Sequence, residues 1–377
     1  MSTRTRTSTR TAGHTGHAGP TSPTPAWRPG TFAFTVHPRT RLREDMGRVW
    51  SPLGHVPERA YDTALRRLPV PPVAMASIHI GGSQVGHVVL VPFGARHLLD
   101  QPGEGRDRVH RAVDKARGLG CSTVGLGALT ATVTGGGVSL RGRTDIGVTN
   151  GNAFTAAIVD DQARMLLGHV GRLGSAHVAV VGATGSVGSA VTRLLARDRA
   201  AGRLTLVARS AGRLEALAAE VGRRVPTVAA TSIDAVAGAD LVILLTASAD
   251  ALLEPHHLRP GAVVLDATQP RNTSPDLLAA RPDVLVVDGG VVSIPSLRLV
   301  GGTIGLPDGR AYACFAETAL LALSGHRGHF SIGVPSLELV DETRRLAGEL
   351  APLGFRAATP TSFGRPVDLA TRTLAVA

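Results

Sequence analysis

The sequence predicts an α/β protein built around a doubly wound parallel Rossmann sheet. A glycine loop at 182–188 lies between an apolar run and a helical pattern. From residue 177 onward, short apolar runs alternate with segments that can hold helices or crossovers. Most of these runs are apolar throughout, as expected for parallel strands that are covered on both faces. A smaller α/β region precedes this sheet, and a helical segment follows it.

The glycine loop predicts a dinucleotide site. It follows the apolar run 178–181 and opens the helical pattern 189–195. Gly182 permits the tight turn, Gly185 lets the backbone approach the phosphates, and Gly188 allows helix and strand to pack closely. Backbone N–H groups and the helix dipole then face a pyrophosphate. An ordinary turn is the alternative, but both flanking elements are present, so we expect contacts from Gly182, Thr184, Gly185, Ser186, Val187 and Gly188.

The alternation divides the chain into four parts. Residues 1–30 are rich in Thr, Ser, Arg, Gly and Pro, so we expect a disordered tail, with a transit peptide as the alternative. Residues 31–150 form an N-terminal α/β domain. Residues 151–310 form the Rossmann domain with a linker helix, and residues 311–377 form a helical segment that carries a cysteine.

The expected elements follow apolar runs and helical periodicity. Strands are expected at 31–36, 73–80, 86–92, 123–126, 177–181, 203–208, 226–230, 240–245, 262–266 and 284–288. Helices are expected at 58–68, 106–118, 153–172, 311–324 and 336–351. The strands from residue 177 onward suffice for a complete dinucleotide-binding domain.

Composition restricts the classes of function. The chain has 377 residues, 43% of them hydrophobic, and no run of about 18 apolar residues, so we expect no integral membrane association. Aromatic residues make up 3% and are not interleaved with basic ones, which argues against a nucleic-acid partner. Two cysteines and no evident secretory signal predict a reducing cytoplasm. The oligomeric state stays open.

The formal net charge of +11 comes almost entirely from arginine. Lys115 is the only lysine, so 39 of the 40 basic residues are arginines, a bias typical of a GC-rich genome. A basic body favours an acidic partner such as a carrier protein or a phosphorylated cofactor. A scattered, solvated arginine surface is the alternative.

The end of the second Rossmann strand indicates which dinucleotide is bound. An acidic residue there would hold a ribose 2′-hydroxyl, but this chain has Arg209 and Ser210, with Arg213 one helical turn further on. A guanidinium forked onto a phosphate and backed by a hydroxyl suits NADP. The residues therefore favour NADPH over NADH, with an incidental surface arginine as the alternative.

Two further loops follow strand ends. Thr246, Ala247 and Ser248 come after the fourth strand of the Rossmann domain, and Gly290 lies in the loop after the sixth. Ligands of open α/β sheets bind at the carboxyl ends of the strands. We expect the nicotinamide and its ribose near these loops, with ordinary turns as the alternative.

The cysteines differ in their surroundings. Cys314 starts a helical pattern after a Gly/Pro/Asp loop, and a thiol in the first turn of a helix is expected to have a lowered pKa. Buried packing is the alternative for a lone cysteine in an apolar helix. Cys121, between Gly120 and an expected strand, fits that packing role.

Several segments together resemble a known family, the long-chain acyl-[acyl-carrier-protein] reductases of cyanobacteria and their bacterial relatives. The resemblance covers about 32–356 and is most specific in the segment Ala313-Cys314-Phe315-Ala316-Glu317. The other matching segments are 125–130, 149–152, 181–191 and 288–292. In that family the cysteine carries the acyl group as a thioester, so the resemblance implies this role for Cys314. It also implies that the N-terminal α/β domain binds the substrate.

This chain departs from the family's pattern at three places. It has Ala267-Thr268-Gln269-Pro270-Arg271-Asn272 where the cyanobacterial enzymes have a Gly-Gly-Tyr-Pro-Lys-Asn-like turn, and Thr149-Asn150-Gly151-Asn152 in place of Thr-Thr-Gly-Asn. The segment 301–310 differs as well. Acyl-chain length and the choice between acyl-carrier protein and coenzyme A stay open.

The implied reaction is reduction of an acyl thioester to an aldehyde with NADPH. Cys314 is the expected nucleophile, and Asn152 is the expected oxyanion donor, with a structural cap as the alternative. Glu317 shares the helix face of Cys314 and is expected to cap or be solvated rather than to modulate the thiol. His37, a possible general acid, fits a packing role better. We expect no metal site.

Two other functions compete with this one. A shikimate- or amino-acid-type NADP-dependent dehydrogenase needs a lysine–aspartate pair, but Lys115 lies in a charged helix rather than at a strand end. A non-catalytic NADPH-binding protein would bind cofactor without oxidising it.

Overall fold

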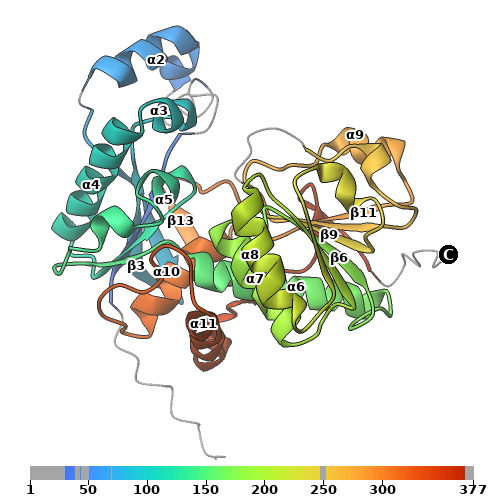
Figure 1. The fold of residues 1–377 in the computed structure, drawn as a ribbon. Coiled ribbons are helices and arrows are strands. Elements are labelled where there is room, and N and C mark those ends of the chain that lie inside the picture. Colours follow the sequence, from blue (N-terminus) through green and yellow to red (C-terminus); the bar gives the residue numbers. More distant parts are fainter. Residues whose placement is uncertain (1–29, 39–42, 44–50, 69, 247–251, 370–377) are drawn as a thin grey trace, which may run out of the picture.

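The computed structural model describes residues 30–38, 43, 51–68, 70–246 and 252–369. The expected tail up to residue 29, and the predicted cofactor residues Ala247 and Ser248, lie outside the described residues. The described chain forms two six-stranded sheets with helices between and around them (Figure 1).

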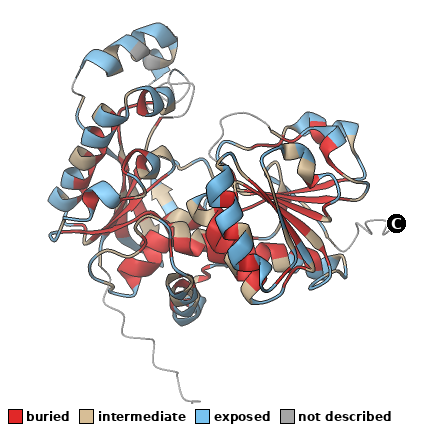
Figure 2. Ribbon diagram, in the orientation of Figure 1, coloured by how far each residue is buried: buried red, intermediate tan, exposed pale blue. Residues whose placement is uncertain are grey.

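The second sheet is the expected Rossmann sheet. Its order is β11-β10-β9-β6-β7-β8, and every pairing is parallel. The strands are β6 (His177–Val181), β7 (Arg203–Val207), β8 (Thr227–Ala230), β9 (Leu241–Leu244), β10 (Val263–Asp266) and β11 (Leu285–Asp288). All six predicted strands are confirmed. Most of their residues are buried, as Figure 2 shows, because helices cover the sheet.

The helices of this half follow their strands directly. They are α7 (Ser186–Arg197), α8 (Ala211–Gly222) and α9 (Pro275–Ala280), with the short turns η3 (Ile233–Val236) and η4 (Pro255–His257). The first strand, β6, lies between β7 and β9, so strand order reverses beside it. Ligands bind at such a switch point.

The N-terminal sheet is mixed, with order β13-β2-β3-β1-β4-β5. Its strands are β1 (Phe32–Val36), β2 (Val73–Ile80), β3 (Ser83–Leu90), β4 (Thr123–Leu126), β5 (Gly147–Thr149) and β13 (Arg298–Val300). Its helices are η1 (Ser51–His55), α2 (Glu58–Arg67), α3 (Ala95–Asp100), α4 (Pro102–Gly118), α5 (Leu129–Val133) and η2 (Val138–Leu140). Because β13 pairs with β2, the chain returns to this sheet before residue 310.

Two central helices connect the halves. α6 (Asn152–His169) packs against α7, and α10 (Ala313–Leu323) packs against α6 and against β1 and β4 of the N-terminal sheet. Phe315 of α10 meets Phe32 and Phe34 edge-on, with ring centroids 5.7 and 5.2 Å apart. The helix predicted at 311–324 therefore belongs to the core of the N-terminal half.

The C-terminal segment is helical only in part. Residues 310–312 form β14 rather than helix, because they pair with β12 (Val291–Ser293), so α10 begins at Ala313. After α11 (Leu337–Glu349) come η5 (Ala351–Leu353), β15 (Arg356–Ala357), β16 (Thr361–Ser362) and β17 (Arg365–Pro366). Within the described ranges, no helix is both long and apolar enough to cross a membrane.

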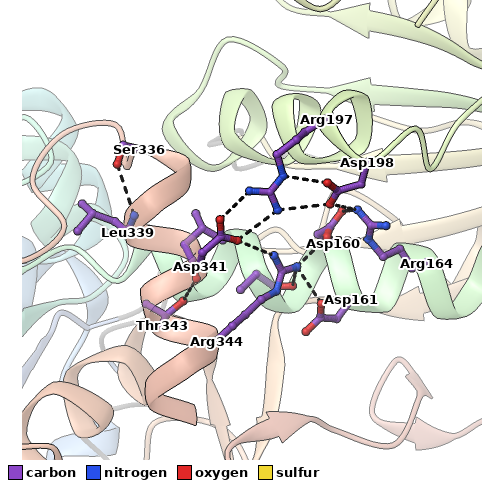
Figure 3. Close-up of polar contacts among 12 residues, drawn as sticks. Asp160, Asp161, Arg164, Arg197, Asp198, Ser336, Leu339, Asp341, Thr343 and Arg344 are labelled. Carbon is purple, nitrogen blue, oxygen red and sulfur yellow. Dashed lines mark hydrogen bonds and ion pairs between the residues drawn. The ribbon is translucent and has the colours of Figure 1, made fainter. Parts of the chain in front are cut away.

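An arginine–aspartate network fixes α11 to α6 and α7 (Figure 3). Asp160 of α6 is fully buried and accepts from Arg164 at 2.8 Å and from Arg344 of α11 at 2.7 Å. Arg197 of α7 bonds Asp341 of α11 at 2.7 Å. The buried carboxylate thus joins two guanidinium groups from different helices.

Replacing the buried carboxylate should destabilise the protein measurably. Asp160→Asn keeps one acceptor oxygen but removes the buried negative charge that faces the guanidinium groups of Arg164 and Arg344, so we expect the free energy of unfolding to fall by about 1–3 kcal/mol. Glu220→Gln, which breaks a solvent-exposed pair with Arg193, should cost less than about 1 kcal/mol. Urea unfolding measures both, and equal losses would contradict a special role for Asp160.

Candidate active site

The glycine loop forms a tight cradle at the end of β6. Gly182 has φ +88°, and a Cβ there would lie 2.5 Å from Leu245 O. A Cβ on Gly188 would lie 2.2 Å from Gly182 O, so both positions require glycine. Gly185 is the N-cap of α7, whose first turn is Ser186, Val187 and Gly188. This geometry fits a pyrophosphate bound by backbone N–H groups.

The predicted 2′-phosphate residues lie at the carboxyl end of β7. Arg209 and Arg213 are exposed, and neither pairs with any carboxylate in the described part of the chain. Ser210 is the N-cap residue of α8, and its hydroxyl makes no capping bond. Two guanidinium groups and a hydroxyl are therefore available to an anion at this edge.

The loop after β10 is organised by one buried carboxylate. Asp266 accepts from the hydroxyl of Thr268 at 2.6 Å and from that of Thr273 at 2.7 Å. Asn272 N also donates to Asp266, and the side chain of Asn272 accepts from the hydroxyl of Thr246. The loop after β9, where Thr246 lies, is thus tied to the segment in which this chain departs from the cyanobacterial pattern.

The loop after β11 reaches the thiol helix. Gly290 has φ +69°, its N–H donates to Gln162 Oε1 at 2.9 Å, and its carbonyl accepts from Ala313 N at 2.9 Å. Ala313 is the first residue of α10, directly before Cys314. Gly290, predicted as a cofactor residue, therefore contacts the helix that carries the thiol.

Cys314 lies against the turn at the start of α6. Gly151 has φ +74°, and a Cβ on it would lie 2.3 Å from both Cα and Cβ of Cys314. Gly151 follows the carboxyl end of β5, and Gly290 follows that of β11. The thiol helix therefore begins where the carboxyl edges of both sheets meet.

The expected lowering of the thiol pKa is wrong in sign. Burial raises the pKa of Cys314 from 9.0 to about 12, and the nearby Glu317 carboxylate adds to the rise. The backbone N–H groups of the first turn act in the opposite direction, but desolvation outweighs them. Cys121, predicted as a packing residue, is buried and its thiol pKa is raised to about 11.

Glu317 is a buried carboxyl that caps a neighbouring helix. It accepts from the Thr149 hydroxyl and, at 2.7 Å, from Phe154 N in the first turn of α6. Its side chain is fully buried, and burial raises its pKa from 4.5 to about 7. The expected capping role is therefore observed, at the N-terminus of α6 rather than of its own helix, but the carboxylate also raises the pKa of Cys314, a modulation that the sequence did not favour.

The two asparagines beside Gly151 hold loops on either side. Asn150 Nδ2 donates to Gly136 O at 3.0 Å and to Gly333 O at 2.9 Å. Asn152 Nδ2 donates to Ser186 Oγ of the glycine loop at 2.8 Å. Asn152 thus follows Gly151, the residue that contacts Cys314, and its side chain already binds the glycine loop. Its role as oxyanion donor stays a prediction.

His37, the general-acid candidate from the sequence, has a structural role. His37 Nδ1 lies 2.8 Å from Pro38 O, and its Nε2 accepts from Leu129 N at 3.4 Å. This arrangement is that of a packing histidine. Lys115 is exposed on α4, away from a strand end.

One group of metal-ligand types occurs among the described residues, formed by Asp234, His256 and His257. His257 Nδ1 accepts from Glu254 N at 3.0 Å, so its proton is on Nε2, which faces Asp234 at 3.3 Å. A protonated Nε2 offers no lone pair to a metal ion. The group therefore fits the capping of η4 better than a metal site.

Sequence reasoning missed most of the residues that assemble this site. Thr149, Asn150 and Gly151 lie in a segment that resembles the acyl-[acyl-carrier-protein] reductases, yet the sequence predicts a role only for Asn152. Gln162 and Gly333 carried no signal, because their partners lie 128 and 147 residues away along the chain.

Comparison with known proteins identifies the nucleotide-binding half. Residues 177–287 match the family described as semialdehyde dehydrogenase, NAD binding domain. The match runs from β6 into β11 and includes the glycine loop. The chain therefore contains an NAD(P)-binding domain of dehydrogenases and reductases.

Two curated proteins are similar over longer stretches. Aminotransferase PigE of Serratia sp. is 28% identical over 299 residues, which cover 76% of this chain and 34% of PigE. The long-chain acyl-[acyl-carrier-protein] reductase of Synechococcus elongatus is 31% identical over 193 residues, which cover 49% of this chain and 54% of the reductase. The matches thus span about a third and about half of these relatives' lengths.

The similar solved structures cover smaller parts of this chain. The iminosuccinate reductase of Paracoccus denitrificans in complex with NAD+ is 23% identical, covering 31% of this chain and 36% of that chain at a TM-score of 0.26. L-alanine dehydrogenase is 18% identical, covering 41% and 52% at a TM-score of 0.28.

The raised thiol pKa predicts slow alkylation of the free protein. Because the pKa of Cys314 is about 12, the thiolate fraction and the iodoacetamide rate should rise about tenfold per pH unit from 7 to 9. Peptide mass spectrometry measures the rate, and Cys314→Ser identifies the signal of Cys121. A plateau near pH 8 would contradict the raised pKa.

Glu317 should make stability depend on pH. With a pKa raised from 4.5 to about 7, the folded protein binds more protons than the unfolded chain in this interval. Its contribution to stability is therefore present below pH 4.5 and is lost as the pH rises to about 7, by roughly 3 kcal/mol in total. Glu317→Gln should remove this slope in urea unfolding at several pH values. An unchanged slope in the variant would exclude Glu317 as its source.

Proposed function

We propose that this protein reduces an acyl thioester to an aldehyde with a nicotinamide dinucleotide, through an acyl-enzyme on Cys314. The placement of Cys314 carries the proposal, because the helix that bears it begins between the Gly151 turn and the Gly290 loop. The distant similarity to an acyl-[acyl-carrier-protein] reductase supports the same chemistry.

The first step is transfer of the acyl group to the protein. Cys314 Sγ bonds to the thioester carbonyl carbon, the bond from that carbon to the carrier sulfur breaks, and the carrier thiol leaves with the proton. The helix N-terminus around Cys314 supplies N–H groups near the developing negative charge. The sequence predicts Asn152 as a further donor, but its Nδ2 already donates to Ser186 Oγ, so the backbone N–H groups are the proposed donors.

The second step reduces the acyl group and restores the free thiol of Cys314. A bound nicotinamide dinucleotide supplies a hydride to an acyl carbon. The glycine loop would hold its pyrophosphate, and Thr246 and Gly290, which lie after the carboxyl ends of β9 and β11, would lie near its nicotinamide ring. Collapse of the thiohemiacetal oxyanion on Cys314 then breaks the carbon–sulfur bond and releases the aldehyde, and the thiolate takes up one proton from solvent. The proposed carriers are acyl-carrier protein and coenzyme A.

The acyl-enzyme should be visible by mass. Without cofactor, acyl-coenzyme A or acyl-[acyl-carrier protein] should add one acyl group to the wild-type protein and none to Cys314→Ser in intact mass spectrometry. Cys121→Ala should still acylate. An unmodified wild type, or a Cys314→Ser variant with full aldehyde production, would reject the mechanism.

An absorbance assay on the wild-type protein distinguishes the competing functions. NADPH absorbance with a panel of acyl thioesters should fall if the proposal is right. Cofactor binding without any oxidation would favour a non-catalytic protein, and oxidation with small polar ketones alone would favour a dehydrogenase without a covalent step.

We propose NADPH as the preferred cofactor because Arg209, Ser210 and Arg213 are available at the end of β7. Arg209→Ala should raise the Kd for NADPH about 10- to 100-fold and leave that for NADH nearly unchanged. Arg223→Ala, at the far end of α8, is the matched control. Fluorescence titration measures the constants, and equal effects on both cofactors would refute the assignment.

A further inference from the structure

One chain of hydrogen bonds joins the cofactor loop to the N-terminal half of the protein. Asn152 Nδ2 donates to Ser186 Oγ at 2.8 Å, and Ser186 Oγ donates to Gly333 O at 2.8 Å. Asn150 Nδ2 donates to the same carbonyl at 2.9 Å, and Gly333 N donates to Gly136 O at 2.8 Å. The hydroxyl of Ser186 is therefore the one link in this chain that belongs to the glycine loop.

Binding of a pyrophosphate by the glycine turn does not require the hydroxyl of Ser186. A pyrophosphate is bound by the backbone N–H groups of the glycine turn and by the helix dipole. Ser186 is the first residue of α7, and its side chain spans to Asn152, 34 residues away, and to Gly333, 147 residues away. Its contacts thus connect the glycine loop to the segments that flank Gly151 and contact the N-terminal half.

We propose that Ser186 and Asn152 are positioning residues for hydride transfer, which align the cofactor loop with the acyl group on Cys314. The proposal rests on the proposed function. The acyl transfer to Cys314 needs no cofactor, so it does not depend on this alignment. Hydride transfer does, because reacting atoms must lie about 3–3.5 Å apart and a displacement near 1 Å costs about 100-fold.

The experiment separates the two half-reactions. Stopped-flow mass spectrometry gives the rate of Cys314 acylation without cofactor, and single-turnover absorbance gives hydride transfer from saturating NADPH to the preformed acyl-enzyme. Ser186→Ala should leave acylation within about twofold and slow hydride transfer roughly 10- to 100-fold. Ser186→Thr, which keeps the hydroxyl, should recover most of the rate.

Ser189→Ala is the matched control. Ser189 lies one turn along the same helix, and its hydroxyl bonds only within the helix, to Ser186 O at 3.3 Å. Both half-reactions should be unchanged in this variant. Asn152→Ala and the double variant complete a cycle, in which the double variant should be no slower than either single one because the two side chains act as one unit.

A readout without turnover tests the same link. In cofactor-free protein, hydrogen–deuterium exchange of the segment 331–336 should be faster in Ser186→Ala than in wild type and unchanged in Ser189→Ala. Unchanged exchange in Ser186→Ala would overturn the positioning role.

The remaining outcomes are also decisive. A raised Kd for NADPH with full hydride transfer at saturation would make Ser186 a phosphate ligand only. Slower acylation in Asn152→Ala would assign Asn152 to the oxyanion and overturn its positioning role. If the wild type forms no acyl adduct, the proposed function itself fails, whereas an adduct with normal hydride transfer in Ser186→Ala refutes this inference alone.

Discussion

The contact between Gly151 and Cys314 is the constraint on which the candidate site depends. A side chain at residue 151 would overlap the backbone of Cys314, so α6 and α10 can approach only at a glycine with φ +74°. This approach leaves Asn150 and Asn152 on either side of the turn, where they reach the loop at 331–333 and the glycine loop. One residue without a side chain thus allows the thiol, the cofactor loop and the N-terminal sheet to meet.

The buried carboxyl of Glu317 joins the elements that meet at this contact. α10 is otherwise almost entirely apolar, yet it carries Glu317 one turn after Cys314. The carboxyl accepts from Thr149 at the end of β5 and from Phe154 in the first turn of α6. Donors unsatisfied at a helix N-terminus need such an acceptor when they are buried. The carboxyl therefore fixes three elements at one point, and its raised pKa is the consequence of placing it there.

The sequence predicted the parallel sheet well because buried parallel strands give continuous apolar runs that need no partner to be recognised. It also predicted the glycine loop, whose requirement for glycine is local. It missed the return of β13 to the N-terminal sheet and the strands β12, β14 and β15, since two or three residues show no periodicity. The sign of the pKa shift of Cys314 depends on desolvation by the surrounding protein, which includes contacts from distant segments such as the turn at Gly151, 163 residues away. The expectation of a lowered pKa rests on the helix dipole, but desolvation outweighs its effect on Cys314.

The raised pKa of the Cys314 thiol is compatible with the proposed acyl transfer. Transfer of an acyl group from one thiol to another consumes one thiol and one thioester and forms one of each, so no net proton is taken up or released. While both thiols stay protonated, the equilibrium of acyl transfer is therefore independent of pH, and the high pKa of Cys314 acts on the barrier by lowering the thiolate fraction. In the free protein the same burial keeps the sulfur protonated, and protonated thiols react slowly with oxidants and electrophiles. The arrangement that positions Cys314 against Gly151 would thus also protect it until a thioester reaches the site.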